Sequence, residues 1–206
     1  MDSRDLPFLE KVLKKWLNVI ETIAKEWDWE DVPWGYTERA LLSTFAAAIW
    51  KTGGFAFEEY STEKRSIKKK GGIKGNLYAG RCDLYFKIEK REFVVEAKHV
   101  WSSAGEKSAN TVLKIREAIN AASKAVKKIK SDEEGRIAIV FAAPYIPTSQ
   151  KAEIKQLLKN WVKKIEEISK VECLNVAWTL PIRELNKDTK ERWLYPGIAI
   201  LIKKIS

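Results

Sequence analysis

An aspartate in one short apolar segment and a Glu-x-Lys triplet in the next constrain this chain more than any other feature. The first segment, 80–86, contains Asp83, and the second, 93–101, contains Glu96 and Lys98. Both segments have the β-branched and aromatic composition of strands. In a strand of period two, Glu96 and Lys98 lie on one face, and burying them is costly unless they are paired or bind a metal. The pattern therefore predicts a polar site on a β-sheet.

The two segments predict a β-hairpin with a turn of even length. In the simplest arrangement, Lys90 and Arg91 form a two-residue turn. Asp83 then lies opposite Lys98, with Glu96 as its diagonal neighbour on the same face, roughly 7–8 Å away at Cα. Any even-length turn keeps the three site residues on one face, whereas an odd one without a bulge separates them.

The composition predicts a folded domain with a polyanionic partner. The chain has 206 residues, 45% of them hydrophobic, and its 38 Lys and Arg against 28 Asp and Glu give a formal net charge of +10. This surplus suits nucleic acid, although solubility alone also explains it. We expect no membrane association, because no apolar run reaches the ~18 residues of a transmembrane helix and no signal peptide opens the chain. Cys82 and Cys173 match no zinc spacing and, as lone thiols, favour the cytoplasm.

The spacing of apolar residues predicts helices and strands in alternation. Helical spacing predicts helices at 6–27, 37–51, 104–130 and 149–170. Apolar runs predict strands at 55–60, 80–86, 93–101, 136–143, 173–180 and 197–203, of which 136–143 suits a central strand covered on both faces. The basic, glycine-rich stretch 64–80 predicts a loop or an irregular hairpin end. We expect one domain, 36–206, preceded by a helical extension, 1–35.

The order of these segments resembles that of the PD-(D/E)xK nuclease superfamily. A helix and a strand are followed by a strand with Asp83, a strand with Glu96-Ala97-Lys98, a helix and a further strand, so the resemblance covers residues 37–143. The chain departs from the pattern at Cys82, where the family often has proline. The resemblance implies a restriction-endonuclease-like α/β fold, with a mixed central sheet flanked by helices.

The resemblance also implies a magnesium-dependent nuclease site. Asp83 and Glu96 would bind Mg²⁺, or Mn²⁺ as its substitute, and the Ala97 carbonyl would add a ligand, since these hard ions prefer oxygen donors. Lys98 would orient or deprotonate the attacking water, or stabilise the developing charge. In this superfamily a glutamate on the helix before the first strand often completes the site, which points to Glu38.

Glu58 and Glu59 are the alternatives to Glu38 as a further carboxylate. Glu38 heads the apolar stripe of the predicted 37–51 helix, in a first turn where glutamate is favourable in any case. By alternation, one of Glu58 and Glu59 faces the site from the first strand. The only histidine, His99, is expected to face away from Lys98 and to pack rather than to catalyse, which gives little support to histidine-dependent hydrolysis.

The predicted nucleic-acid contacts lie just ahead of or within the aspartate strand: Lys68, Lys69, Lys70, Lys74 and Arg81. The leading hypothesis is a metal-dependent nuclease acting on DNA. The resemblance also allows a homodimer, because nucleases of this fold are often dimeric when both strands are cut. Two alternatives stay open. One is a non-catalytic nucleic-acid-binding or assembly protein that keeps the fold, and the other is a protein-interaction module with a basic surface.

Overall fold

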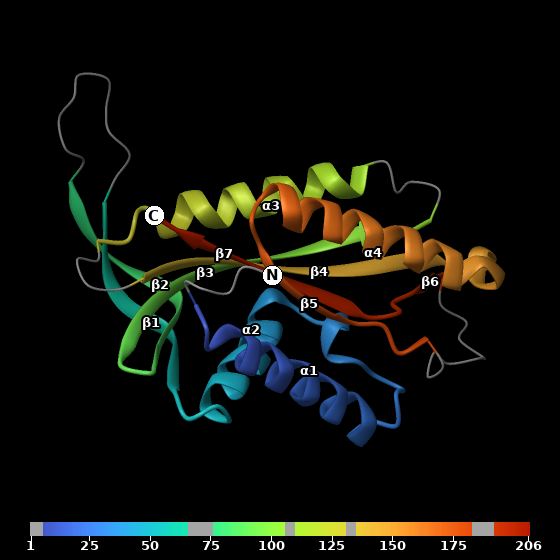
Figure 1. Cartoon of the computed structure of the whole chain (residues 1–206), viewed down its shortest axis with the longest axis horizontal. Coiled ribbons are helices and arrows are strands. Elements are labelled where there is room, and N and C mark those ends of the chain that lie inside the picture. Colours follow the sequence, from blue (N-terminus) through green and yellow to red (C-terminus); the bar gives the residue numbers. More distant parts are fainter. Residues whose placement is uncertain (1–5, 66–75, 106–109, 131–134, 183–191) are drawn as a thin grey trace.

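A mixed sheet flanked by helices organises the chain. The computed structural model describes residues 6–65, 76–105, 110–130, 135–182 and 192–206, and this described part contains four α-helices and a seven-stranded sheet (Figure 1). The helices are α1 (Leu9–Glu26), α2 (Glu38–Trp50), α3 (Thr111–Val126) and α4 (Ile154–Val171). The strands are β1 (Phe55–Arg65), β2 (Leu77–Ile88), β3 (Arg91–Ser103), β4 (Gly135–Pro147), β5 (Asn175–Thr179), β6 (Trp193–Leu194) and β7 (Ile198–Ile205). Two short 3₁₀ helices, η2 (Pro33–Gly35) and η4 (Thr148–Glu153), complete these elements.

The strands are ordered β1-β2-β3-β4-β7-β5, and β6 pairs with β4 off this path. β1, β2 and β3 form an antiparallel meander, whereas β3 and β4 are parallel and joined by α3. β7 and β5 continue the sheet antiparallel. Figure 1 shows α1 and α2 on one face and α3 and α4 on the other. The predicted α/β class, with helices ahead of the strands, is confirmed.

β4 lies in the middle of the sheet, and apolar residues cover both of its faces. Ile137, Ile139 and Phe141 are buried with α1 and α2, while Val140 and Ala142 are buried with α3 and α4. The prediction of a doubly covered strand at 136–143 is therefore confirmed. Among the described helices, none is both long and apolar enough to cross a membrane.

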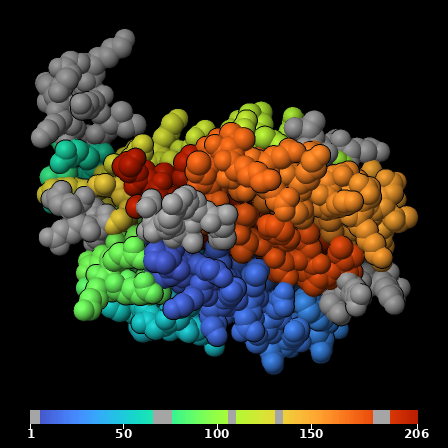
Figure 2. All heavy atoms as spheres, viewed as in Figure 1, coloured from blue at the N-terminus to red at the C-terminus, as the bar shows by residue number. Residues whose placement is uncertain are grey.

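The N-terminal helix shares the core of the sheet. Most of the apolar stripe of α1 is buried in one cluster with α2 and the sheet, and the Trp16 indole donates to Thr44 Oγ1 at 2.9 Å. Thr179 in β5 donates to Glu21 Oε1 at 2.7 Å. In Figure 2 the blue atoms of the N-terminal helices lie directly against the orange and red atoms of the C-terminal half. The division at residue 35 stays a prediction, but the two parts bury their apolar residues together.

The hairpin turn lies one residue earlier than predicted. Ile88 pairs with Arg91, so the turn residues are Glu89 and Lys90, which adopt φ of 49° and 64°. These left-handed conformations are those of the tight turns that match strand twist. The turn has an even number of residues, as predicted, but the pairing of β2 with β3 is shifted relative to the predicted register. Asp83 therefore comes level with Glu96 and not with Lys98.

The edges of several predicted elements also differ. β1 runs on to Arg65 and pairs there with Leu77, so the described ends of the basic stretch are paired strands, which agrees with the hairpin alternative of the prediction and not with the loop. The helix predicted from residue 104 begins at Thr111, since β3 continues to Ser103. Lys68, Lys69, Lys70 and Lys74 lie outside the described residues, and their role stays a prediction.

Candidate functional site

The candidate site lies where β3 separates from β2. The ladder between them ends at the Leu84–Val95 pair, although β3 continues to Ser103 along β4. Beyond that pair, the edge of β3 that faced β2 carries backbone N–H groups that require other acceptors. Two carboxylates from outside β3 meet this requirement.

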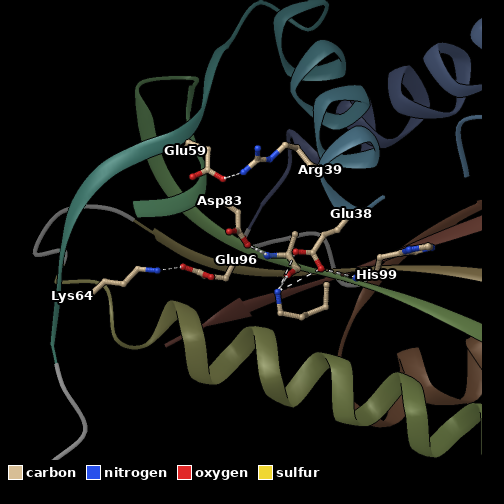
Figure 3. Close-up of polar contacts among 9 residues, drawn as sticks. Glu38, Arg39, Glu59, Lys64, Asp83, Glu96 and His99 are labelled. Carbon is tan, nitrogen blue, oxygen red and sulfur yellow. Dashed lines mark hydrogen bonds and ion pairs between the residues drawn. The ribbon is translucent and has the colours of Figure 1, made fainter. Parts of the chain in front are cut away.

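Asp83 and Glu38 supply those carboxylates. Asp83 Oδ2 accepts from the Ala97 amide at 2.7 Å, and Glu38 Oε2 accepts from the His99 amide at 2.9 Å. Glu38 is placed by the start of α2, which Thr37 caps by accepting from the Ala40 amide at 3.4 Å. Figure 3 shows Glu38 and Asp83 approaching the same stretch of β3 from α2 and β2.

Lys98 joins the same group of residues. Its Nζ lies 2.5 Å from the Ala97 carbonyl oxygen and 3.2 Å from Glu38 Oε1. The ammonium group is thus shared between a backbone acceptor and a carboxylate that β3 itself holds in place. This geometry restricts Lys98 to the immediate surroundings of Ala97.

Glu96 is the most buried carboxylate of the group. Its side chain is 7% exposed, and Lys64 Nζ lies 2.6 Å from Oε1. Burial raises the pKa of Glu96 above its ordinary value, the hydrogen bond from Lys64 acts against this, and the charge of Asp83 raises the pKa further. The two carboxylates are therefore close enough to repel each other, a situation that a bound cation relieves.

Two arginines and Glu59 lie beside these residues. Glu59 Oε1 is 2.5 Å from Arg39 and Oε2 is 3.6 Å from Arg81. The arginine side chains are 70% and 67% exposed, so their guanidinium groups are open to a ligand. Figure 3 shows the Arg39–Glu59 pair near Asp83. Glu59 therefore forms ion pairs with the two arginines. Of the three candidate glutamates, Glu38 is the one that contacts Lys98 and the His99 amide.

The backbone of Glu59 is unusual. Glu59 has φ of 52°, in the left-handed region that non-glycine residues seldom adopt. It lies level with Asp83, between the Glu58–Leu84 and Tyr60–Cys82 pairs. Such an outlier beside a cluster of charged residues is typical of a functional site.

Cys82 and His99 are held in their uncharged forms. Burial, with the neighbouring charge of Glu96, raises the pKa of the Cys82 thiol to about 12. Burial lowers the pKa of His99, whose ring packs edge-on against Trp101 with 4.7 Å between centroids. A protonated thiol is a poor nucleophile and a neutral, buried imidazole has limited access to solvent. Neither group adds a second reactive centre to the site.

The oxygen atoms at the site are of the chemical type that hard divalent cations prefer. Asp83, Glu96 and the Ala97 carbonyl provide the carboxylate and carbonyl oxygens that Mg²⁺ and Mn²⁺ prefer. In the structure these oxygens bond to a backbone amide and to the ammonium groups of Lys64 and Lys98. Among the described residues, no three His, Cys, Asp or Glu side chains come close enough to hold a metal. These donors are of the kind that Mg²⁺ prefers, and a bound ion would also need water ligands and the displacement of both lysine ammonium groups.

The structure brings most of the predicted site residues together. Glu38, Asp83, Glu96, Ala97 and Lys98 converge, and Arg81 lies beside them. Sequence analysis did not assign Lys64, which fell in the predicted loop or irregular hairpin end, or Arg39 to the site. A weak signal for Lys64 was Thr62, a β-branched residue that extends the strand pattern beyond Tyr60. Arg39 carries no signal apart from its position next to Glu38.

Comparison with known proteins does not add to this description. No protein-family model, no curated protein and no solved structure matches the chain.

Proposed function

We propose that this chain is a metal-dependent nuclease that hydrolyses phosphodiester bonds in DNA. The observation that carries the proposal is the convergence of Glu38, Asp83, Glu96 and Lys98 from three elements onto one stretch of β3. Satisfying the free amides of β3 accounts for one acceptor at each position, but the convergence also brings two more charged side chains, Glu96 and Lys98, to the same stretch. The proposal includes the restriction-endonuclease-like fold, which the helix–strand order and the three-stranded meander support.

Asp83, Glu96 and the Ala97 carbonyl would hold the metal. A bound Mg²⁺ supplies a nucleophilic water at neutral pH and neutralises charge on the phosphate. Lys98, once its ammonium has left the Ala97 carbonyl, would orient a bound water or stabilise the charge that develops on the phosphoryl oxygens. Glu38 acts through Lys98 and the His99 amide, and is therefore a positioning residue.

The charge of the chain supports a nucleic-acid substrate. A net charge of +10 attracts a polyanion over long range, and Arg39 and Arg81 present exposed guanidinium groups next to the carboxylates. Guanidinium groups bind phosphate in a bidentate manner. The two arginines are thus suited to the phosphates that flank the cleaved bond.

A second candidate function is a nucleic-acid-binding protein without catalysis. The observation that favours it is the pairing of Lys64 with Glu96 and of Lys98 with Glu38, which neutralises both carboxylates without a metal. In this alternative the ion pairs are permanent and stabilise the sheet. The protein would then bind DNA with strong salt dependence and show no turnover.

A cleavage assay decides between the two. The purified chain is incubated with duplex, single-stranded and branched DNA and with RNA, in Mg²⁺, Mn²⁺ or EDTA. We expect metal-dependent cleavage of DNA that the Asp83→Asn variant does not perform. Binding of DNA without cleavage of any substrate in either metal would support the second candidate and refute the first.

A further inference from the structure

Lys64 makes the shortest side-chain contact with Glu96, from a part of β1 beyond the strand that the sequence predicted at 55–60. Its Nζ is 2.6 Å from Glu96 Oε1, and the two side chains are 17% and 7% exposed. Glu96 is also a carboxylate proposed to hold the metal. The protein's own ammonium group therefore bonds to an oxygen that the cation would need.

The backbone of Lys64 is fixed from both sides. On one side Lys64 pairs with Tyr78 in β2, and on the other it forms an antiparallel bridge with Ile129, after α3. The Arg65 amide donates to Lys128 O at 2.7 Å, and the Lys130 amide donates to Glu63 O at 2.8 Å. This part of β1 is thus held as a strand on both edges, and only the side chain of Lys64 is free to change position.

Gly80 leaves room for that side chain. An ideal Cβ added at Gly80 would lie 3.0 Å from both Cγ and Cδ of Lys64, closer than most real Cβ contacts. The aliphatic stem of Lys64 therefore crosses β2 over a residue without a side chain and reaches Glu96 on β3. Figure 3 shows Lys64 extending from β1 toward Glu96.

We propose that Lys64 is an internal cation that occupies the Glu96 position in the metal-free protein and is exchanged for the divalent cation. The inference rests on the proposed function, since it takes Glu96 as a metal ligand. A monovalent ammonium and a divalent ion cannot both lie at roughly 2–3 Å from one carboxylate oxygen without strong repulsion, by Coulomb's law at short range. Metal binding through Oε1, or through both oxygens of Glu96, therefore requires Lys64 to move toward solvent, and the charge of Lys64 weakens metal affinity.

Lys64→Met tests the exchange by metal binding alone. Calorimetric titration with Mn²⁺ at pH 8 is performed on the wild type, on Lys64→Met and on Lys87→Met. Lys87 is the matched control, because it forms an ion pair of the same length, 2.6 Å, with Glu92. This pair lies near the turn of the β2–β3 hairpin, away from Glu96. We expect Lys64→Met to bind Mn²⁺ about tenfold more tightly or better, since a competing charge is removed, and Lys87→Met to bind as the wild type does.

A labelling experiment on the wild type tests the same exchange without a variant that must fold. Lysines are acetylated briefly with and without Mn²⁺, and the modified fraction at Lys64 and Lys87 is measured by mass spectrometry. We expect Mn²⁺ to raise the modification of Lys64 severalfold and to leave Lys87 unchanged. Increased labelling supports the exchange, because the ammonium has left Glu96.

The outcomes separate this inference from the function on which it rests. Mn²⁺ binding that Asp83→Asn abolishes, together with unchanged affinity in Lys64→Met and unchanged labelling of Lys64, would overturn the exchange and leave the metal site standing. No Mn²⁺ binding by the wild type would overturn both.

Discussion

Glu38 makes a hydrogen bond and an ion pair with β3, and the Glu38→Gln substitution removes only the ion pair. Its carboxylate accepts from the His99 amide and forms an ion pair with Lys98. Glu38→Gln keeps an acceptor for the amide and removes the charge. The pair is 38% and 34% exposed, so its loss changes stability by about 0–1 kcal/mol. Turnover should fall by about tenfold or more, because Lys98 loses the group that orients it.

Single-turnover cleavage and thermal melting measure the two effects. Glu63→Gln is the control, because it removes an exposed partner of Lys130, 3.0 Å away, outside the site. Equal turnover in the two variants would show that Glu38 does not position Lys98 for the reaction.

His99 predicts how stability depends on pH. Because burial lowers its pKa, the folded state binds a proton there less readily than the unfolded state. The contribution of neutral His99 to the free energy of unfolding is therefore fully present above the unfolded-state pKa of 6.5. It is lost as the pH falls through the lower pKa of the folded state. Nε2 has no hydrogen-bond partner among the described residues, so a carbon atom can replace it.

His99→Phe should weaken this pH dependence. Urea unfolding of the wild type should show a decrease in stability between pH 7 and pH 5 that is smaller in the variant. The same decrease in both proteins would mean that other groups account for it.

At the scale of elements, α2 and β2 each present an arginine beside the site. Glu59 braces Arg39 and Arg81 from β1. If both bind phosphates, the Arg39→Ala, Arg81→Ala double variant should bind duplex DNA more weakly. The slope of log affinity against log salt should then become shallower by roughly 0.9 for each phosphate that an arginine no longer neutralises.

A control of equal charge distinguishes local binding by the arginines from the net charge of the chain. Lys159→Ala with Lys163→Ala removes two exposed charges from α4. Binding measured from 50 to 300 mM salt should keep the wild-type slope in this control. An equal change of slope in both double variants would place the interface elsewhere.

Several elements of the site could be predicted from sequence because they depend on local rules. The even hairpin follows from the alternation of Asp83 and Glu96, and the place of Glu38 follows from the Thr37 cap. The exact turn could not be predicted, since Glu89 and Lys90 are not residues that favour left-handed φ. That shift of one residue decides which side chain comes level with Asp83.

Lys64 could not be placed from sequence because its position depends on long-range pairing. Its strand is extended by pairing with residues 77–80 and by the segment after α3, more than sixty positions along the chain. Likewise, Trp50 follows the helical pattern of α2 but is exposed, because α2 ends at the edge of the sheet beside β1. Periodicity identifies an apolar side chain but not whether a neighbour covers it.

At the scale of the whole molecule, α1 is part of the core that supports the site. Trp16 is fully buried, contacts Phe141 in β4 and donates to Thr44 in α2. Trp16→Ala should reduce stability by about 3–5 kcal/mol, because it opens a cavity and removes the hydrogen bond.

Urea unfolding followed by far-UV circular dichroism and by tryptophan fluorescence tests this. We expect coincident single transitions in the wild type and an earlier, still single, transition in the variant. Trp50→Ala, at an exposed position, is the control and should unfold near the wild type. Two separate transitions in the wild type would show that residues 1–35 fold independently.

The central claim is that the residues around Ala97 form a hydrolytic site, and Lys98→Met tests it most directly. Methionine keeps most of the length of the side chain and removes the ammonium that lies 2.5 Å from the Ala97 carbonyl. In single-turnover cleavage of DNA with Mg²⁺, we predict a rate about 10²-fold below that of the wild type, with Mn²⁺ affinity equal to or higher than that of the wild type and the melting temperature retained. A variant that binds metal, melts normally and cleaves at the full wild-type rate would contradict the account.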